Sequence, residues 1–207
     1  MPSRDYHEAI WGQVPHGVEP ADFALRRGFL LESVAAGERV LDLGCGEGWF
    51  AAALARAGVS VLAADVAEAP LRRACDTHPG LDLHLLGAEA EWDLADASFD
   101  AVWAGEVIEH VADTAGWLSE VRRVLRPGGR LLVTTPSFER AELLAAALSR
   151  RFFATHFDPR SDHLRHYSHA TLSQLISGFG FERPEVRVAG RRPGRRVLLA
   201  RAVRSRF

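Results

Sequence analysis

A short apolar strand followed at once by a glycine-rich turn constrains this chain more than any other feature, and it occupies residues 39–50. The first part of this stretch is an apolar run of the kind that is buried on both faces of a parallel sheet. Glycine then recurs at every second position, Gly44, Gly46 and Gly48, where the backbone can adopt positive φ and a ligand can lie close to it. Because open α/β sheets bind ligands at the carboxyl ends of their strands, the stretch predicts such a sheet with a ligand at this turn.

The spacing of the glycines indicates which ligand this is. The dinucleotide fingerprint G-x-G-x-x-G is absent, because Trp49 occupies the place of its third glycine. Asp42 instead completes a D-x-G-x-G-x-G pattern, which resembles motif I of the class I S-adenosylmethionine-dependent methyltransferases. The resemblance implies S-adenosylmethionine as methyl donor. The residues of the turn that it assigns to the donor are Asp42, Gly44, Cys45, Gly46 and Gly48.

Length and composition are those of one ordinary globular domain. The chain has 207 residues, of which 47% are hydrophobic and 25% charged, so we expect a single domain over residues 1–207. Residues 1–36 are expected to form cap helices at its amino end. No apolar run approaches a membrane span and no basic-then-apolar leader opens the chain, so we expect a cytoplasmic monomer or homodimer. All 25 basic residues are arginine, which excludes a lysine base.

The order of expected elements predicts an α/β fold. Strands are expected at residues 39–43, 59–65, 81–86, 101–105, 131–135, 185–189 and 195–203. Helices are expected at 5–13, 20–35, 49–57, 67–76, 115–125, 139–153 and 171–179. The resemblance implies that they form a Rossmann-like, seven-stranded, mostly parallel sheet with helices on both faces and a C-terminal antiparallel hairpin.

Two further residues are predicted to bind the donor. Asp65 ends the second strand about 20 residues after the turn, where a carboxylate can accept from both hydroxyls of a ribose. The alternative is that Asp65 caps the next helix; Val66 follows it into the predicted site. Arg26 matches the arginine that binds the donor's carboxylate in ubiquinone-pathway O-methyltransferases, since a guanidinium can bond both oxygens. The alternative is an ordinary surface arginine.

The adenine contact is the place where the chain departs from the family. Residues 87–100 resemble the block G-D-A-x-x-L-P-F-x-x-x-S-F-D, and residues 98–100 match it well. The acid that binds the adenine amino group falls on Ala88, which cannot accept that hydrogen bond. Either the neighbouring Glu89 replaces it, or the backbone alone makes the contact.

An E-x-x-E-H sequence follows the fourth strand and Gly105. In a helical turn its members Glu106, Glu109 and His110 would share one face. Two carboxylates and an imidazole can hold a divalent cation such as Mg²⁺, Mn²⁺ or Zn²⁺. The set resembles the metal-binding triplet of ubiquinone-pathway O-methyltransferases and of small-RNA 2′-O-methyltransferases. A further histidine ligand would come from a later segment, and His163 or His166 could fill that place.

A metal-free site is the other interpretation of the same residues. Methyl transfer to a hydroxyl requires removal of a proton, and histidine titrates near neutrality. His110 is the first candidate for that base, with His163 and His166 behind it, and Glu109 would pack beside the methionine part of the donor. Gly105 and Glu106 are assigned to the donor in this interpretation. Both interpretations remain open at this stage.

The leading functional hypothesis is methyl transfer from S-adenosylmethionine to a small-molecule acceptor, at a hydroxyl. One alternative is a metal-dependent RNA 3′-terminal 2′-O-methyltransferase. From residue 150 onward the chain has thirteen arginines and four acids, a local excess of +9 (13 − 4) that would suit nucleic acid. A solvated basic edge on a small protein is the simpler explanation of that excess, and nucleic acid stays an open alternative to a small-molecule partner. The other alternative is a non-catalytic module that binds S-adenosylmethionine.

Overall fold

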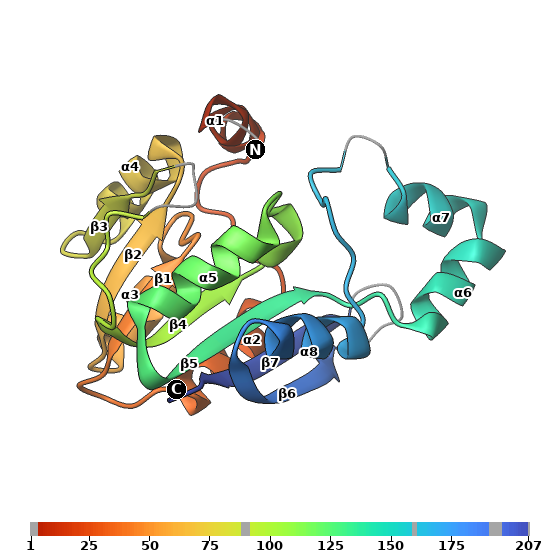
Figure 1. Cartoon of the computed structure of the whole chain (residues 1–207). Helices are drawn as coiled ribbons and strands as arrows, with labels where there is room; N and C mark the ends of the chain where they lie inside the picture. Colours follow the sequence, from red (N-terminus) through yellow and green to blue (C-terminus); the bar gives the residue numbers. More distant parts are fainter. Residues whose placement is uncertain (1–3, 88–91, 159–160, 191–195, 207) are drawn as a thin grey trace.

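The computed structural model describes residues 4–87, 92–158, 161–190 and 196–206. The described residues form one seven-stranded sheet in the order β3-β2-β1-β4-β5-β7-β6 (Figure 1). Strands β1 to β5 pair in parallel, and β7 is antiparallel to both β5 and β6. The predicted α/β class, mostly parallel sheet and antiparallel C-terminal pair are confirmed. Of the hairpin turn expected at 190–194, residues 191–194 lie outside the described residues.

The elements follow the order expected from the sequence. The strands are β1 Arg39–Leu43, β2 Ser60–Asp65, β3 Asp82–Leu85, β4 Phe99–Gly105, β5 Leu125–Pro136, β6 Phe181–Ala189 and β7 Val197–Arg204. The helices are α1 Arg4–Gln13, α2 Phe23–Glu32, α3 Trp49–Arg56, α4 Glu68–Thr77, α5 Thr114–Val124, α6 Arg140–Leu148, α7 Arg150–His156 and α8 His169–Gly178, with the 3₁₀ turn η1 at Ile108–His110. None of the helices in the described part of the chain has the length and apolar character that crossing a membrane requires.

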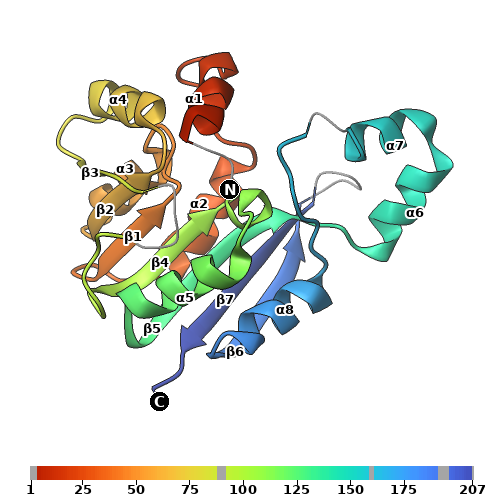
Figure 2. The same cartoon turned by 45° about the horizontal axis from the view of Figure 1, so that its top comes forward.

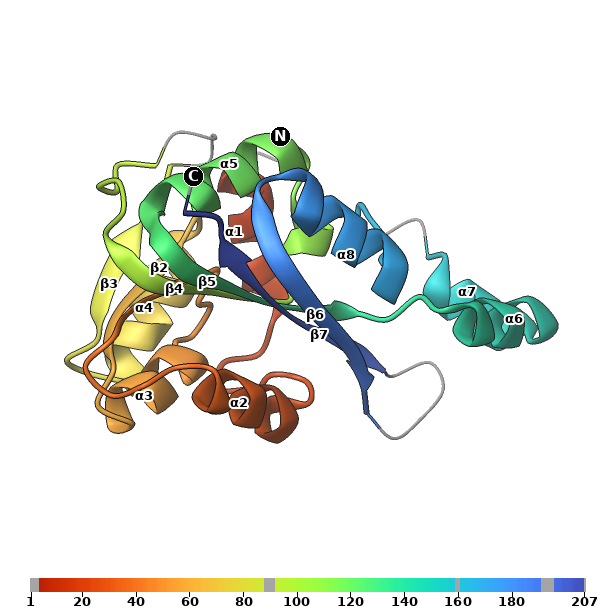
Figure 3. The same ribbon diagram turned by 60° about the horizontal axis from the view of Figure 1, so that its bottom comes forward.

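Successive side chains of the central strand β4 pack alternately into two separate hydrophobic cores. Val102 and Ala104 pack in the core beneath α5 and α8, whereas Ala101 and Trp103 pack in the core beneath α2 and α3. Figure 3 shows these helix pairs on opposite faces of the sheet. All four side chains are fully buried, so β4 is apolar on both faces as a central parallel strand requires. This burial leaves the carboxyl edge of the sheet as the place for polar chemistry.

Two local predictions are wrong. The composition of residues 126–130 predicts a turn, but β5 begins at Leu125, and its register against β4 shifts so that residues 126–129 bulge out. The single helix expected over 139–153 is broken at Ser149, whose backbone is extended (φ −128°, ψ 112°), into α6 and α7. These two helices extend away from the sheet (Figures 1 and 2), and the hydrophobic core clusters of the described residues contain none of their side chains.

The glycine turn has the backbone that its sequence predicts. Gly44, Gly46 and Gly48 all lie in the left-handed region, with φ of 72°, 54° and 78°. Just before the turn, the fully buried carboxyl group of Asp42 accepts the backbone N–H of Ala51 and so joins β1 to α3. Burial raises the pKa of Asp42 to about 7, although this hydrogen bond acts in the opposite direction.

The raised pKa of Asp42 predicts a pH dependence of stability. Between about pH 4, where the unfolded carboxyl titrates, and about pH 7, the folded chain keeps a proton that the unfolded chain has released. The free energy of unfolding contributed by this group therefore falls as pH rises through that window. The Asp42→Asn variant should lack this fall. Its free energy of unfolding, relative to that of wild type, should therefore increase by up to about 4 kcal/mol between pH 4 and 8. Urea unfolding across this range measures it; parallel wild-type and variant curves would contradict it.

Candidate active site

A cavity of about 540 Å³ opens at the carboxyl edge of β1, β2 and β4, on the side where the sequence predicts a ligand. Its wall comes from helix α1, from the strand ends and from two later segments of the chain. The lining residues are Tyr6, His7, Ile10, Trp11, Val14, Gly44, Asp65, Val66, Glu106, Val107, His110, Asp162 and Leu164. Five residues predicted to form the site, Gly44, Asp65, Val66, Glu106 and His110, are thus brought to one cavity.

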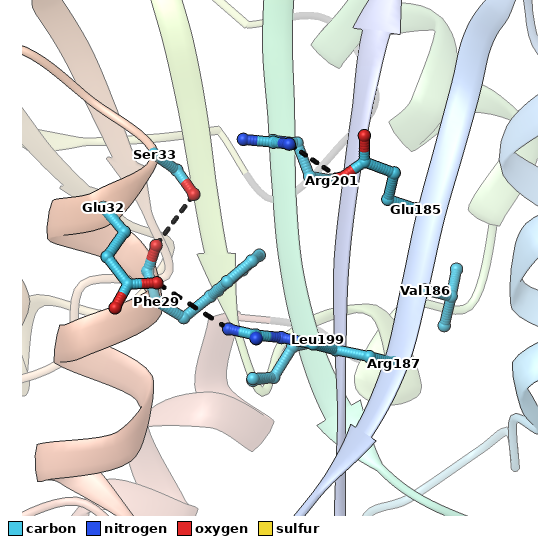
Figure 4. A pocket seen from close by; sticks show the side chains of 8 residues that line it. All are labelled: Phe29, Glu32, Ser33, Glu185, Val186, Arg187, Leu199 and Arg201. Atoms are coloured by element: carbon cyan, nitrogen blue, oxygen red, sulfur yellow. Dashed lines mark hydrogen bonds and ion pairs between the residues drawn. The ribbon is translucent and has the colours of Figure 1, made fainter.

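A second cavity of about 410 Å³ lies between α2 and the β6–β7 pair (Figure 4). Its charged groups are paired with one another: Arg201 lies 2.6 Å from Glu185, and Arg187 lies 3.9 Å from Glu32. The hydroxyl of Ser33 donates to a backbone carbonyl of its own helix. No residue predicted from the sequence to bind a ligand lines this cavity, so the first cavity is the candidate site.

Asp65 holds the glycine turn in place. One carboxylate oxygen accepts the backbone N–H of Gly46 at 3.0 Å, and the other accepts that of Ala67 at 3.0 Å. Burial raises the pKa of Asp65, and these backbone hydrogen bonds oppose the rise. Each oxygen keeps a second lone pair for a ligand hydroxyl. Asp65 therefore contacts the backbone just before α4, whose N-cap residue is Ala67, and its side chain also lines the cavity.

The turn has no room for side chains. A Cβ atom on Gly44 would lie 2.6 Å from Cγ2 of Val107, and one on Gly46 would lie 2.9 Å from Cη2 of Trp11. Both distances are shorter than real carbon contacts. The Trp11 ring therefore lies directly over the Gly46 backbone, and helix α1 closes over the turn.

Arg26 is a buried residue, so the interpretation as a surface arginine is wrong. Its Nε donates to Oγ1 of Thr134 at 3.0 Å, and its guanidinium lies 4.8 Å from the centroid of the Phe50 ring. A Cβ atom on Gly105 would lie 2.5 Å from Nη2, so glycine at this position leaves the guanidinium its space. Burial lowers the pKa of Arg26, and the carboxyl group of Glu106 opposes this most strongly. Arg26 lies behind the cavity, beside the end of β4.

Glu106 has the backbone conformation of a strained residue. Its φ of 58° is in the left-handed region, which costs a non-glycine residue on the order of 1–3 kcal/mol and is found most often at ligand sites. Its Oε1 is buried, with no hydrogen-bond partner among the described residues. Burial raises its pKa, and the nearby charge of Arg26 lowers it. The Glu106 side chain belongs to the lining of the cavity, together with Gly44 and Asp65.

Only the end of the E-x-x-E-H sequence, Ile108–His110, forms the expected helical turn, η1; Glu106 lies before it. The Glu109 side chain is only 1% exposed, and neither of its oxygens has a hydrogen-bond partner in the described part of the chain. Burial, reinforced by the charge of Glu106, raises the pKa of Glu109 to about 8.

His110 is bound to a residue that the sequence does not indicate. Its Nδ1 lies 3.1 Å from the backbone oxygen and 3.2 Å from Oδ2 of Asp162, while its Nε2 lies 3.9 Å from Oε1 of Glu109. Burial lowers the pKa of His110, but the hydrogen bond to Asp162 and the two acidic charges outweigh it and raise the pKa overall. The ring is thus held in one orientation at the cavity wall.

Asp162 reaches His110 because residues 161–167 are bound across η1. The backbone N–H groups of Leu164 and Arg165 both donate to the carbonyl of Glu109, at 2.8 and 3.2 Å. The Arg165 guanidinium bonds two further carbonyls that follow η1. About fifty residues separate the two segments in sequence, and no local sequence pattern predicts the contact between His110 and Asp162. Sequence reasoning therefore missed Asp162.

The remaining predicted residues take different places. The His163 and His110 rings are 4.9 Å apart, and ligand atoms of Glu109, His110 and His163 lie within 4.8 Å of one another. Glu106 is not a member of this group among the described residues. His166 stacks on Phe138 at 4.1 Å and does not line the cavity. Ala88 and Glu89, the candidates for the adenine contact, lie outside the described residues.

Helix α1 is fastened beside this site. The Glu8 carboxylate accepts the first backbone N–H groups of α4, and Arg4 donates to the carbonyls of Val66 and Leu86. Arg73 of α4 donates to the carbonyls of Trp11 and Val14 at the end of α1, both at 3.0 Å. These bonds place one face of α1 over the carboxyl edge of the sheet (Figure 2).

Fold and site together define an α/β methyltransferase architecture, and comparison with known proteins agrees. Residues 18–185 match the family model described as a methyltransferase domain. The chain belongs to this family and is a class I S-adenosylmethionine-dependent methyltransferase by sequence and fold, as its motif I predicts. A solved S-adenosylmethionine-dependent methyltransferase from Mesorhizobium loti superimposes with a TM-score of 0.68 at 24% identity, over 89% of this chain and 98% of that one.

Two curated relatives show how far the similarity extends. A probable S-adenosylmethionine-dependent methyltransferase of Mycolicibacterium smegmatis is 37% identical over 71% of this chain and 53% of its own length. A ubiquinone biosynthesis O-methyltransferase of Dinoroseobacter shibae is 40% identical over 48% of this chain and 41% of its own length. The chain therefore spans about half the length of these relatives.

The contacts of Arg73 predict how firmly α1 is held. The Arg73→Met variant loses the bonds to Trp11, Val14 and Glu47, each worth about 1 kcal/mol. The equilibrium constant for local opening of α1 should rise at least about tenfold. The rate of chymotrypsin cleavage near Trp11 would report this change. Arg72→Met is the matched control, because that arginine is exposed and pairs only with Glu68 of its own helix among the described residues. Equal cleavage rates in both variants would contradict the arrangement.

Proposed function

We propose that this protein transfers a methyl group from S-adenosylmethionine to a hydroxyl group of a small molecule. The observation that carries the proposal is the meeting, in one cavity, of the glycine turn, Asp65 and the histidine of η1. The O-methyltransferase among the relatives supports oxygen as the accepting atom. The cavity volume of about 540 Å³ is in the range of small-molecule sites.

The residues at the edge of the sheet fit the donor. The left-handed Gly44 lines the cavity with bare backbone, and the carboxylate of Asp65, which holds the turn through Gly46, has free lone pairs for the two ribose hydroxyls. The orphaned Oε1 of Glu106 suits the ammonium group of the donor's methionine part. Arg26, behind it, is the residue that would balance the donor's carboxylate. When bound, the donor supplies a methyl group that its positively charged sulfur already activates.

The residues of the protein must align the acceptor with the methyl group and remove the proton from its hydroxyl. His110 faces the cavity with its ring orientation held by Asp162. In that orientation it can take a proton from a hydroxyl group or, when protonated, donate a hydrogen bond to the same oxygen. The two acids near its ring nitrogens favour the protonated form.

A metal-dependent version is the second candidate, and the cluster of Glu109, His110 and His163 favours it. Such a set could hold Mg²⁺, Mn²⁺ or Zn²⁺ beside the acceptor and lower the pKa of its hydroxyl. The RNA alternative receives less support, because part of the basic excess is neutralised by ion pairs within the chain. These pairs are Arg187 with Glu32 and Arg196 with Glu142, whose acids lie outside the basic segment.

Donor binding tests the first part of the proposal. Asp65→Ala should weaken S-adenosylmethionine binding by about 1–3 kcal/mol, the scale of a charge-assisted pair of hydrogen bonds. Asp76→Ala, an exposed aspartate on α4, is the control and should bind like wild type. Titration calorimetry on both variants, with circular dichroism to confirm folding, gives the comparison. A folded Asp65→Ala variant with wild-type affinity would remove Asp65 from the donor site.

Chelation separates the two versions of the chemistry. We expect turnover of catechols or hydroxybenzoates to survive EDTA, and His110→Ala to reduce kcat by about 10²–10⁴-fold. His84→Ala is the control. That histidine belongs to β3, its ring binds Asp93, and it does not line the cavity. Loss of turnover with EDTA, restored by Mg²⁺, Mn²⁺ or Zn²⁺ while donor affinity stays constant, would establish the metal-dependent version instead.

A further inference from the structure

Helix α1 presents one face to the cavity, and that face carries a single histidine. His7, Ile10, Trp11 and Val14 follow the helical spacing i, i+3, i+4 and i+7, and all four line the cavity. Three of them are apolar or aromatic and suit an organic acceptor. Of the four, His7 is the one whose side chain accepts a proton near neutral pH.

The positions of Glu8 and Trp11 show that this face of α1 is held where the reaction would occur. The carboxylate of Glu8 binds the first N–H groups of α4. Trp11, one turn after His7 on the same face, covers the Gly46 backbone. His7 therefore lines the cavity from helix α1, whereas Asp65 and Glu106 line it from the carboxyl ends of β2 and β4.

His7 differs from His110 in its surroundings. Both nitrogens of His110 face acids, Asp162 at 3.2 Å and Glu109 at 3.9 Å. No hydrogen bond to the His7 ring occurs within the described ranges, where its ring contact is the edge of Tyr6 at 5.7 Å between centroids. An acceptor hydroxyl entering the cavity therefore finds one imidazole held by acids and one whose nitrogens are open to it.

The surroundings of His7 lower its pKa overall. Burial and the positive charge of His110 lower the pKa of His7, while the charge of Asp162 raises it by less. The other titratable groups facing the same cavity are Asp65 from β2 and Glu106 from β4. His7 is accordingly neutral at neutral pH, and a neutral imidazole is the form that can accept a proton.

We propose that His7 is a catalytic residue, the general base that takes the proton of the acceptor's hydroxyl group, while His110 donates a hydrogen bond to the same oxygen. The inference rests on the proposed function and adds a residue from a different element. The acceptor oxygen forms a bond to the methyl carbon, and the carbon–sulfur bond breaks with its electron pair passing to sulfur. The hydroxyl proton moves to His7, which later releases it to solvent.

This division of roles couples chemistry to the docking of α1. Because His7 reaches the acceptor only while α1 lies against α4, Glu8 and Arg73 act as positioning residues for the base. The helix that covers the glycine turn through Trp11 is also the helix that supplies His7. Proton removal would then begin only after the site has closed.

The His7→Gln variant tests the base, with Gln13→Ala on the exposed side of the same helix as control. With catechol as acceptor, His7→Gln should lose about 10²–10⁴-fold in kcat. The calorimetric affinity for S-adenosylmethionine should remain within twofold of wild type, and Gln13→Ala should match wild type in both. Wild-type kcat in His7→Gln, with the loss confined to His110 variants, would overturn the assignment.

A second measurement does not depend on turnover. The ring signals of His7 in NMR spectra, assigned by their absence in His7→Gln, should titrate below the pKa of a free histidine. They should shift when catechol is added to the complex with S-adenosylhomocysteine. Signals that titrate like a free histidine and ignore catechol would overturn the inference, even if donor binding upholds the proposed function. Failure of S-adenosylhomocysteine to bind at all would instead count against the proposed function.

Discussion

The two hydrogen bonds of the Asp65 carboxylate are the interaction on which the site depends. They tie the glycine turn after β1 to the start of α4, so two neighbouring strand ends become one rigid edge. Helix α4 in turn binds α1 through Glu8 and Arg73, and α1 places Trp11 over the turn. A carboxylate suits this position because it alone of the neutral-pH side chains accepts at two oxygens.

Buried acids give this edge its electrostatic character. Asp42, Asp65, Glu106 and Glu109 all have raised pKa values, and burial is the largest cause in each. The guanidinium of Arg26 lies among them and offsets part of the cost of their burial. Such a field favours a ligand with positive charge, and the proposed donor carries one on its sulfur and one on its ammonium group. The strained Glu106 and its orphaned oxygen are consistent with a site whose last partner is the ligand.

Much of the fold follows from local patterns. The apolar run of β1, the acid at the end of β2 and the glycines between them all predict their observed conformations, because each depends on a few adjacent residues. The prediction fails where context decides. The bulge at residues 126–129 exists because pairing with β4 continues on both sides of it. The break at Ser149 occurs in a helical pair that extends away from the sheet, so propensity alone could not locate it.

By itself the sequence determined the sheet, the glycine turn, Asp65 and the presence of Glu109 and His110 beside them, since these are fixed by spacing within short segments. Only the tertiary structure decided which groups face His110. Asp162 comes from a segment laid across η1, and His7 from a helix fastened to α4. Both depend on hydrogen bonds between residues far apart in the chain, and the local sequence pattern does not show which distant residues will meet.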